Sequence, residues 1–91
     1  MAKDDQILNV QPHSDEAELA VLGSMLSSKD AVNTSINLLK ADNFYKDAHG
    51  KIFSAMAKLF DDNVPVDTLS VSELLKKNKE LESIGGIYFL T

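Results

Sequence analysis

The sequence predicts an all-α fold, a small orthogonal bundle of four to five helices of which the last one is truncated. Apolar residues recur at intervals of three and four along most of the chain, which is the spacing of one helix face. Two serines suited to capping a helix, Ser14 and Ser70, each stand just before such a segment. A chain of 91 residues is long enough for one small domain.

The first predicted helix follows a flexible N-terminal arm, residues 1–12, and begins after Ser14. Glu16 and Glu18 lie in its first turn with Asp15, where the helix dipole favours negative charge. Gly23 either allows another helix to approach closely or is tolerated, at a cost of about 1 kcal/mol relative to alanine. The apolar residues cover a wide face, so we expect burial on more than one side: Ala17, Leu19, Ala20, Val21, Leu22, Met25 and Leu26.

Two further helices are predicted from about Ala31 to Leu39 and from about Asp47 to Phe60. The first of them contains weak helix formers, so it should depend on packing more than on intrinsic propensity. A loop over Ala41–Asn43 separates the two. Along the second, Asp47 with Lys51 and Lys58 with Asp62 are spaced to form ion pairs on the exposed side.

A fourth helix is predicted over Val71–Lys77, after an extended segment around Pro65. Ser70 and Glu73 have the spacing of a capping box, and Leu69 and Leu74 that of a hydrophobic staple. The apolar run Ile87–Leu90 then opens a last helix that stops at Thr91, which suggests a fragment of a longer protein. The expected core comprises Leu19, Leu22, Leu26, Ile36, Leu39, Ile52, Phe53, Met56, Leu59, Leu74 and Leu75.

Charge and composition exclude several functions for this chain. It has a net charge of −5, and all nine of its basic residues are lysines. Because arginine and positive charge dominate phosphate recognition, we expect no direct strong nucleic-acid binding. No apolar run approaches the roughly 20 residues that a membrane span needs, so we expect a cytoplasmic protein without a membrane partner.

The residues show no catalytic, cofactor-binding or metal site. His13 and His49 have no second ligand at metal-binding spacing, and we expect His49 at the surface or its boundary. The segment from Asp61 does not fit a calcium loop, because Val66 and Ser72 stand where glycine and glutamate are needed. No phosphate-binding loop ending in Gly-Lys-Ser/Thr is present. Taken alone, the residues indicate a helical interaction module and give no support for a small enzyme.

Four ordered landmarks resemble the N-terminal domain of bacterial replicative DNA helicases of the DnaB family. They are the Pro-His-Ser opening with its Glu-Ala-Glu-Leu continuation (residues 12–23), the Phe-Tyr/His/Ile-Phe/Ala-Met signature (44–56), Pro-Val-Asp (65–67) and the Leu-Glu-Ser-Ile-Gly-Gly segment (81–86). The resemblance covers about Val10 to Leu90. One departure is visible: the family usually has a tyrosine just before the leucine that follows the double glycine, and here Phe89 holds that position after Tyr88.

The resemblance implies that residues 13–91 are the globular head of such a domain, without the helical hairpin and ATPase domain that follow it. In that family the head contributes to the collar of a hexameric ring and to primase docking, and the parent unwinds DNA at the replication fork with ATP. The implied partners are other helicase subunits, primase and a helicase loader. ATP and magnesium would belong to the absent ATPase domain, so this fragment would have no enzymatic activity of its own.

Two alternatives stay open at this point. The chain is either such a head or a stand-alone helical adaptor or regulator that binds a replication protein, and the downstream reading frame would separate them. Candidate interface residues are the aromatic side chains Phe44, Tyr45, Tyr88 and Phe89, because interface centres are rich in such anchors. For Phe44 a place in the core is the stronger expectation. Without the hairpin, the fragment should be a monomer or a weak dimer.

Overall fold

The computed structural model describes residues 14–85, and within that range all regular structure is helical. The four α-helices are α2 (Asp15–Ser27), α3 (Lys29–Leu38), α4 (Asp47–Asp61) and α5 (Thr68–Lys77). Two short 3-10 helices are also present: η1 (Ala41–Asn43) lies between α3 and α4, and η2 (Glu82–Ile84) follows α5. The all-α prediction is confirmed. The predicted arm, residues 1–12, and the apolar run Ile87–Leu90 lie outside the described residues.

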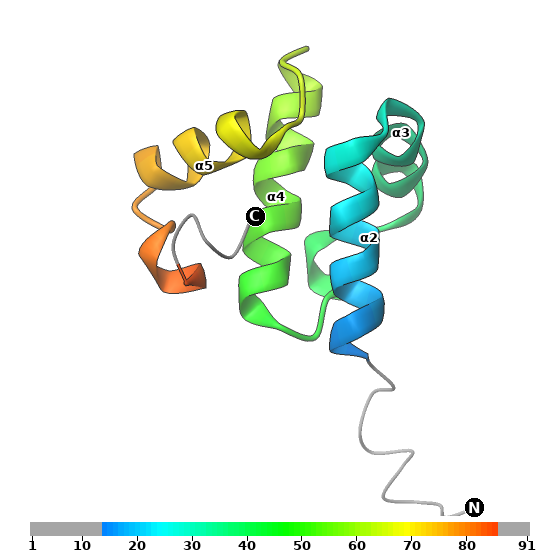
Figure 1. The fold of residues 1–91 in the computed structure, drawn as a ribbon, viewed down its shortest axis with the longest axis horizontal. Coiled ribbons are helices and arrows are strands. Elements are labelled where there is room, and N and C mark those ends of the chain that lie inside the picture. Colours follow the sequence, from blue (N-terminus) through cyan, green and yellow to red (C-terminus); the bar gives the residue numbers. More distant parts are fainter. Residues whose placement is uncertain (1–13, 86–91) are drawn as a thin grey trace, which may run out of the picture.

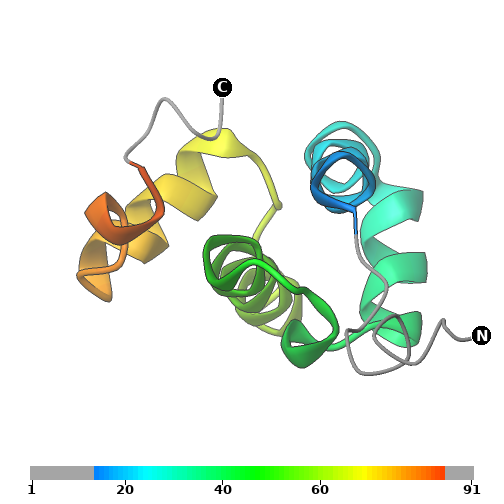
Figure 2. The same cartoon turned by 90° about the horizontal axis from the view of Figure 1, so that it is seen from below.

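Helix α4 occupies the centre of the described fold. The α2–α3 pair packs on one side of it and α5 on the other, as Figures 1 and 2 show from two directions. α5 crosses α4 steeply, whereas α2 runs alongside it. η1 and η2 also contact α4. Because every other element touches α4, this helix carries the largest share of the buried side chains.

Helices α2 and α3 each begin directly after a serine whose side chain caps the first turn. The Ser14 hydroxyl accepts a hydrogen bond from the Ala17 amide at 3.1 Å, which confirms the predicted cap. Ser28 caps α3 in the same way through the Ala31 amide, at 3.2 Å, so α3 begins earlier than predicted. Both serines satisfy backbone N–H groups that the first helical turn leaves without a carbonyl partner.

The predicted start of α5 was wrong. Asp67 is the N-cap, and its carboxylate accepts a hydrogen bond from the Ser70 amide at 2.8 Å. Helix α5 therefore begins at Thr68, and Ser70 lies inside the first turn and not at the cap. Leu69 is 65% exposed, so it does not form the predicted staple with Leu74. Aspartate caps a helix as well as serine does, so residue type alone does not favour Ser70 over Asp67.

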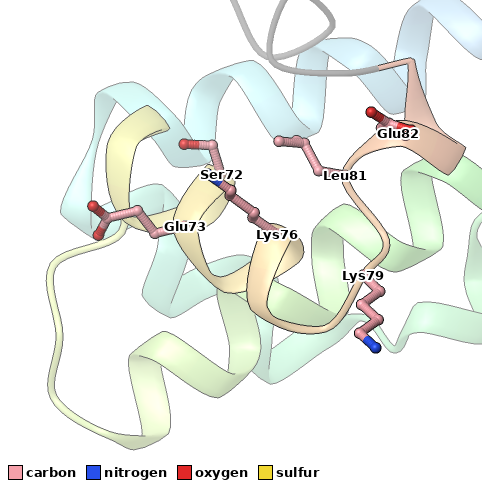
Figure 3. A pocket seen from close by; sticks show the side chains of 6 residues that line it. All are labelled: Ser72, Glu73, Lys76, Lys79, Leu81 and Glu82. Carbon is pink, nitrogen blue, oxygen red and sulfur yellow. The ribbon is translucent and has the colours of Figure 1, made fainter.

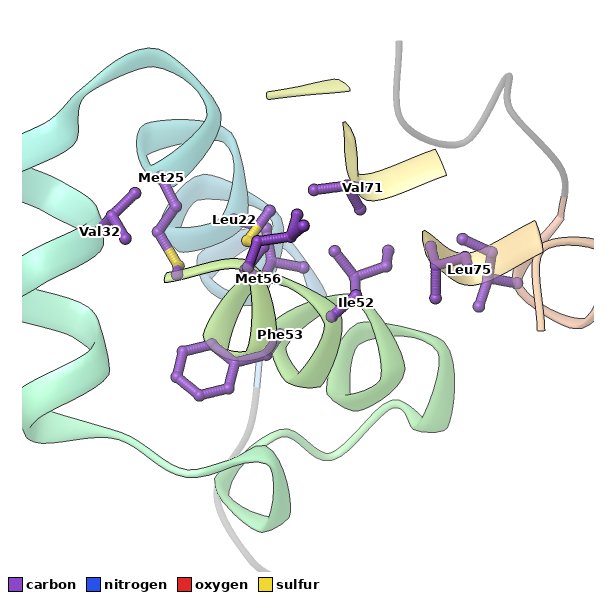
Figure 4. Packing of buried hydrophobic residues seen from close by; sticks show 11 residues of the cluster. Leu22, Met25, Val32, Ile52, Phe53, Met56, Val71 and Leu75 are labelled. Atoms are coloured by element: carbon purple, nitrogen blue, oxygen red, sulfur yellow. The ribbon is translucent and has the colours of Figure 1, made fainter. Parts of the chain in front are cut away.

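The core is centred on α4 (Figure 4). Its buried apolar members are Leu22, Met25, Val32, Ile52, Phe53, Ala55, Met56, Leu59, Val71, Leu75 and Ile84. Of the residues expected there, Leu26, Ile36, Leu39 and Leu74 are partly buried and pack against this cluster. Leu19 is 45% exposed, so its placement in the core was wrong.

Helix α2 is buried on one side only in the described structure. Its buried residues are Leu22 and Met25, which face α3 and α4. Ala17, Leu19 and Ala20 are exposed, which corrects the expectation that this helix is covered on more than one side. A side chain at Gly23 would meet no described atom within 4 Å, so the second alternative holds there, and glycine is tolerated.

Candidate functional site

The connection between η1 and α4 presents an aromatic side chain on a well-supported backbone. We call residues 44–46 the Tyr45 corner. Phe44 packs on the core, with its ring centroid 5.1 Å from that of Phe53 and the two ring planes tilted by 37°. The next residue, Tyr45, is 59% exposed. One residue of the corner is therefore fixed to the core while its neighbour faces outward.

The carboxylate of Glu18, in the first turn of α2, supports this corner from the side. One of its oxygens, Oε2, accepts a hydrogen bond from the Tyr45 amide at 2.6 Å. The other, Oε1, accepts a longer one from the Lys46 amide at 3.4 Å. Lys46 is the N-cap of α4, and its own side chain makes no capping hydrogen bond. The carboxylate thus supplies negative charge at the positive end of the α4 dipole.

The same carboxylate contacts His49 in the first turn of α4. The distance between Glu18 Oε1 and His49 Nδ1 is 2.6 Å, and the two side chains are 12% and 3% exposed. Because an ionised carboxylate can only accept, Nδ1 carries the shared proton. His49 is buried, so its expected surface or boundary position was wrong.

The environment of Glu18 perturbs its acidity in two opposed ways. Burial raises the pKa of its carboxyl group, because removing water disfavours the charged form. Hydrogen bonds from His49, Tyr45 and Lys46, with the charge of a protonated His49, act in the opposite direction. The net result is a pKa below the ordinary value for glutamate. Glu18 is therefore ionised at neutral pH, which its three contacts require.

Sequence reasoning missed this cluster, because Glu18 and His49 are 31 residues apart and only the folding of α2 onto α4 brings them together. Of the candidate interface residues, the structure places Phe44 at the edge of the core and Tyr45 at the surface. Tyr88 and Phe89 lie outside the described residues, as does His13. The interface role of these aromatic residues stays a prediction.

A cleft of about 550 Å³ lies between α5 and the turn that precedes η2 (Figure 3). Glu73 and Lys76 contribute to it from α5, and Leu81 and Glu82 from the segment that follows. Ser72, also at its edge, donates its hydroxyl hydrogen to the Leu69 carbonyl at 2.9 Å. No base activates that hydroxyl within this described lining, so the cleft shows no nucleophilic machinery.

Residues 14–85 contain no group of three histidine, cysteine, aspartate or glutamate side chains placed to hold a metal ion. In the same range, none of the helices is long and apolar enough to span a membrane. The described site is a surface that combines the exposed Tyr45 ring with the Glu18–His49 contact.

Comparison with known proteins decides the family. The sequence model of the DnaB-like helicase N terminal domain matches residues 10–91. The chain belongs to this family. The DnaB-type resemblance of the four sequence landmarks is thereby confirmed.

Curated relatives agree with this assignment. The chain is 39% identical over 82 residues to the replicative DNA helicase DnaB of Geobacillus stearothermophilus, covering 90% of this chain and 18% of that protein. It is 40% identical over 80 residues to the replicative DNA helicase DnaC of Bacillus subtilis, covering 88% of this chain and 18% of that protein. The chain thus spans less than a quarter of the length of these DnaB-family relatives.

A solved structure confirms the fold. The crystal structure of the N-terminal domain of DnaB helicase from Mycobacterium tuberculosis is similar with a TM-score of 0.81 and 37% sequence identity. The match covers 88% of this chain and 56% of that chain. At this identity and similarity, the described helices are those of a DnaB-like N-terminal domain.

Proposed function

We propose that this chain is the interaction and assembly module of a hexameric replicative DNA helicase, contributing to the ring collar and to primase docking. The single observation that carries the proposal is the family match over residues 10–91, nearly the whole chain. The parent would be an ATP-dependent cytoplasmic helicase that unwinds DNA at the replication fork. Other helicase subunits, primase and a helicase loader are its proposed partners.

ATP and magnesium would be bound elsewhere in the parent. The 91 residues contain no Gly-x-x-x-x-Gly-Lys-Ser/Thr loop and no arginine, so we assign neither ATP nor DNA to this chain. The reading frame that follows residue 91 in the gene is the first test. A phosphate-binding loop encoded there supports the proposal, and a nearby stop codon favours the alternative, a stand-alone adaptor that binds a replication protein.

Tyr45 is the described residue that we propose as the anchor for a protein partner. It combines an exposed ring with a backbone that Glu18 and Phe44 hold in place, so binding would order little further. The partner to test is the primase of the same genome, by titration calorimetry with the 91-residue chain. Tyr45→Ala should weaken binding at least tenfold, as is usual for an aromatic anchor.

Leu69→Ala is the matched control for that titration. Leu69 is also an exposed large apolar residue, but it lies in the first turn of α5, beyond the far end of α4 from the Tyr45 corner. The Leu69→Ala variant should bind primase as tightly as the unchanged chain does. Equal loss in both variants, or no loss in Tyr45→Ala, would remove Tyr45 from the proposed interface. Failure of the unchanged chain to bind at all would count against primase docking by the head alone.

Self-association is tested separately, by sedimentation at two protein concentrations. We expect a monomer or a weak dimer, because the 91 residues match only 56% of the similar N-terminal domain chain. Stable dimers generally bury more than roughly 1,200 Å² in total. A stable hexamer of the 91-residue chain would show that the head alone carries the assembly energy.

A further inference from the structure

We propose that the Glu18 carboxylate is an acid-released latch, which fastens α2 to the start of α4 and holds the Tyr45 corner in its observed shape. The latch is a conformational device of the head itself. It stands apart from the proposed function, since the corner can be latched whether or not a partner binds there.

The contacts that the Glu18 carboxylate makes with the rest of the described chain all lie at the Tyr45 corner and in the first turn of α4. A single carboxylate accepts from two successive backbone amides, Tyr45 at 2.6 Å and Lys46 at 3.4 Å. It also contacts His49 at 2.6 Å, one turn further along. Hydrogen bonds to an ionised acceptor are about twice as strong as neutral ones. Of the three contacts, the one with His49 is largely shielded from water. The start of α4 therefore depends on the charge of a residue on another helix.

The charged groups around the latch come from three elements. From α4, His49 faces the carboxylate directly, while Asp47 pairs with Lys51 at 3.1 Å on the exposed side. From the corner, Lys46 pairs with Asp15 at 3.7 Å.

The third element is α2 itself, where Asp15 lies one turn before Glu18. The Lys46–Asp15 pair joins the same two segments as the latch, but both side chains are about half exposed, so it adds little. The charged residues of α3, Lys29 and Asp30, stand at its first turn, next to the last turn of α2 and away from Glu18.

Protonation would release the latch without dismantling the core. A neutral carboxyl group attracts the two amides and His49 less strongly, and its new O–H needs an acceptor of its own. The first turn of α4 would then lose the charge that caps it. Further along α4, Ile52 and Met56 are fully buried against α2 and α5 and involve no titrating group. The lowered pKa of Glu18 keeps the latch closed at neutral pH and places its release below the ordinary range of glutamate.

The test is an NMR titration of the 91-residue chain from pH 7 to pH 3. The side-chain carboxyl carbon of Glu18 and the amides of Tyr45 and Lys46 should shift with one common midpoint. That midpoint should lie below the ordinary range of glutamate. The amides of Ile52 and Met56 should hold their positions through that step.

Two results of the wild-type titration would overturn the latch. In the first, the Tyr45 and Lys46 amides keep their positions while the Glu18 carboxyl titrates. In the second, the core amides shift at the same midpoint, which would mean that protonation of Glu18 disrupts the core together with the corner.

Glu18→Gln, with Glu16→Gln as its control, separates Glu18 from the neighbouring acids. Glu18→Gln should abolish the common step at Tyr45 and Lys46, and Glu16→Gln should leave it unchanged. Persistence of the step in Glu18→Gln would assign it to another group and contradict the proposal. Should Glu18→Gln fail to fold, the wild-type titration decides the question alone.

Discussion

Gly50 lies so close to the backbone of Ala41 that a Cβ atom at position 50 would stand 3.1 Å from the Ala41 carbonyl oxygen. That oxygen also accepts a hydrogen bond from the Phe44 amide at 3.1 Å, which limits how far it can withdraw. Because Gly50 has no side chain, η1 can pack directly against the backbone of α4 there. The glycine that permits a close approach in the described fold is therefore on α4, and Gly23 on α2 is not needed for one.

The first prediction compares alanine at these two glycines. Gly23→Ala should raise the free energy of unfolding by about 0.5–1 kcal/mol, because alanine is the better helix former and the site is open. Gly50→Ala should not show this gain and should lower stability, because the new methyl group meets the Ala41 carbonyl. Chemical denaturation of both variants measures the difference. Equal stabilisation by the two substitutions would show that η1 moves aside at little cost.

The second prediction concerns Phe53, whose ring is 3% exposed and packs on Phe44. Phe53→Ala should lower the free energy of unfolding by about 3–5 kcal/mol, the usual cost of removing a buried ring. Small domains have about 5–15 kcal/mol in total, so a strongly lowered thermal midpoint or an unfolded chain is expected. Leu69→Ala, at an exposed site, should change stability by less than about 0.5 kcal/mol. A midpoint for Phe53→Ala close to wild type would make the ring peripheral.

The spacing of apolar residues along α4 and α5 predicted most of the core, because residues three and four positions apart share one face of a helix. Ile52, Phe53, Met56 and Leu75 are buried as expected. Leu19 was placed in the core and is exposed. The prediction failed because spacing does not show which side of a wide apolar helix face packs against another helix. That choice depends on where α3 and α4 pack.

The Glu18 cluster was not predictable for a related reason. Nothing near Glu18 in the sequence marks it as an acceptor for groups at the start of α4, because His49 lies 31 residues further along the chain. A glutamate in a first helical turn is normally explained by the dipole of its own helix. Here the side chain serves the dipole of another helix, which only the tertiary packing determines.

The third prediction compares the observed cap of α5, Asp67, with Ser70, the cap that the sequence predicted. Asp67→Ala should lower the free energy of unfolding by about 1 kcal/mol, because the Ser70 amide loses the carboxylate that accepts from it at 2.8 Å. Ser70→Ala should be near neutral, since Ser70 lies inside the helix, where alanine is favourable. Denaturation in urea measures both. The reverse order of effects would restore the cap to Ser70.

The fourth prediction is a pH dependence of stability with a definite sign. The pKa of Glu18 is lower in the folded chain than its ordinary value, so the folded state favours the ionised form. The resulting stabilisation is fully present above the ordinary glutamate range and is lost as pH falls through the folded pKa. Glu18→Gln lacks this contribution at every pH.

We therefore expect the stability difference between the unchanged chain and Glu18→Gln to be largest near neutral pH and to shrink in acid. Its size near pH 7 should be about 1–3 kcal/mol, the range for losing hydrogen bonds to a charged group. Urea unfolding at a series of pH values measures it, and Glu16→Gln, which alters an exposed carboxylate, should track wild type throughout. A difference that stays constant down to pH 3 would show that the contribution of Glu18 to stability does not depend on its ionisation.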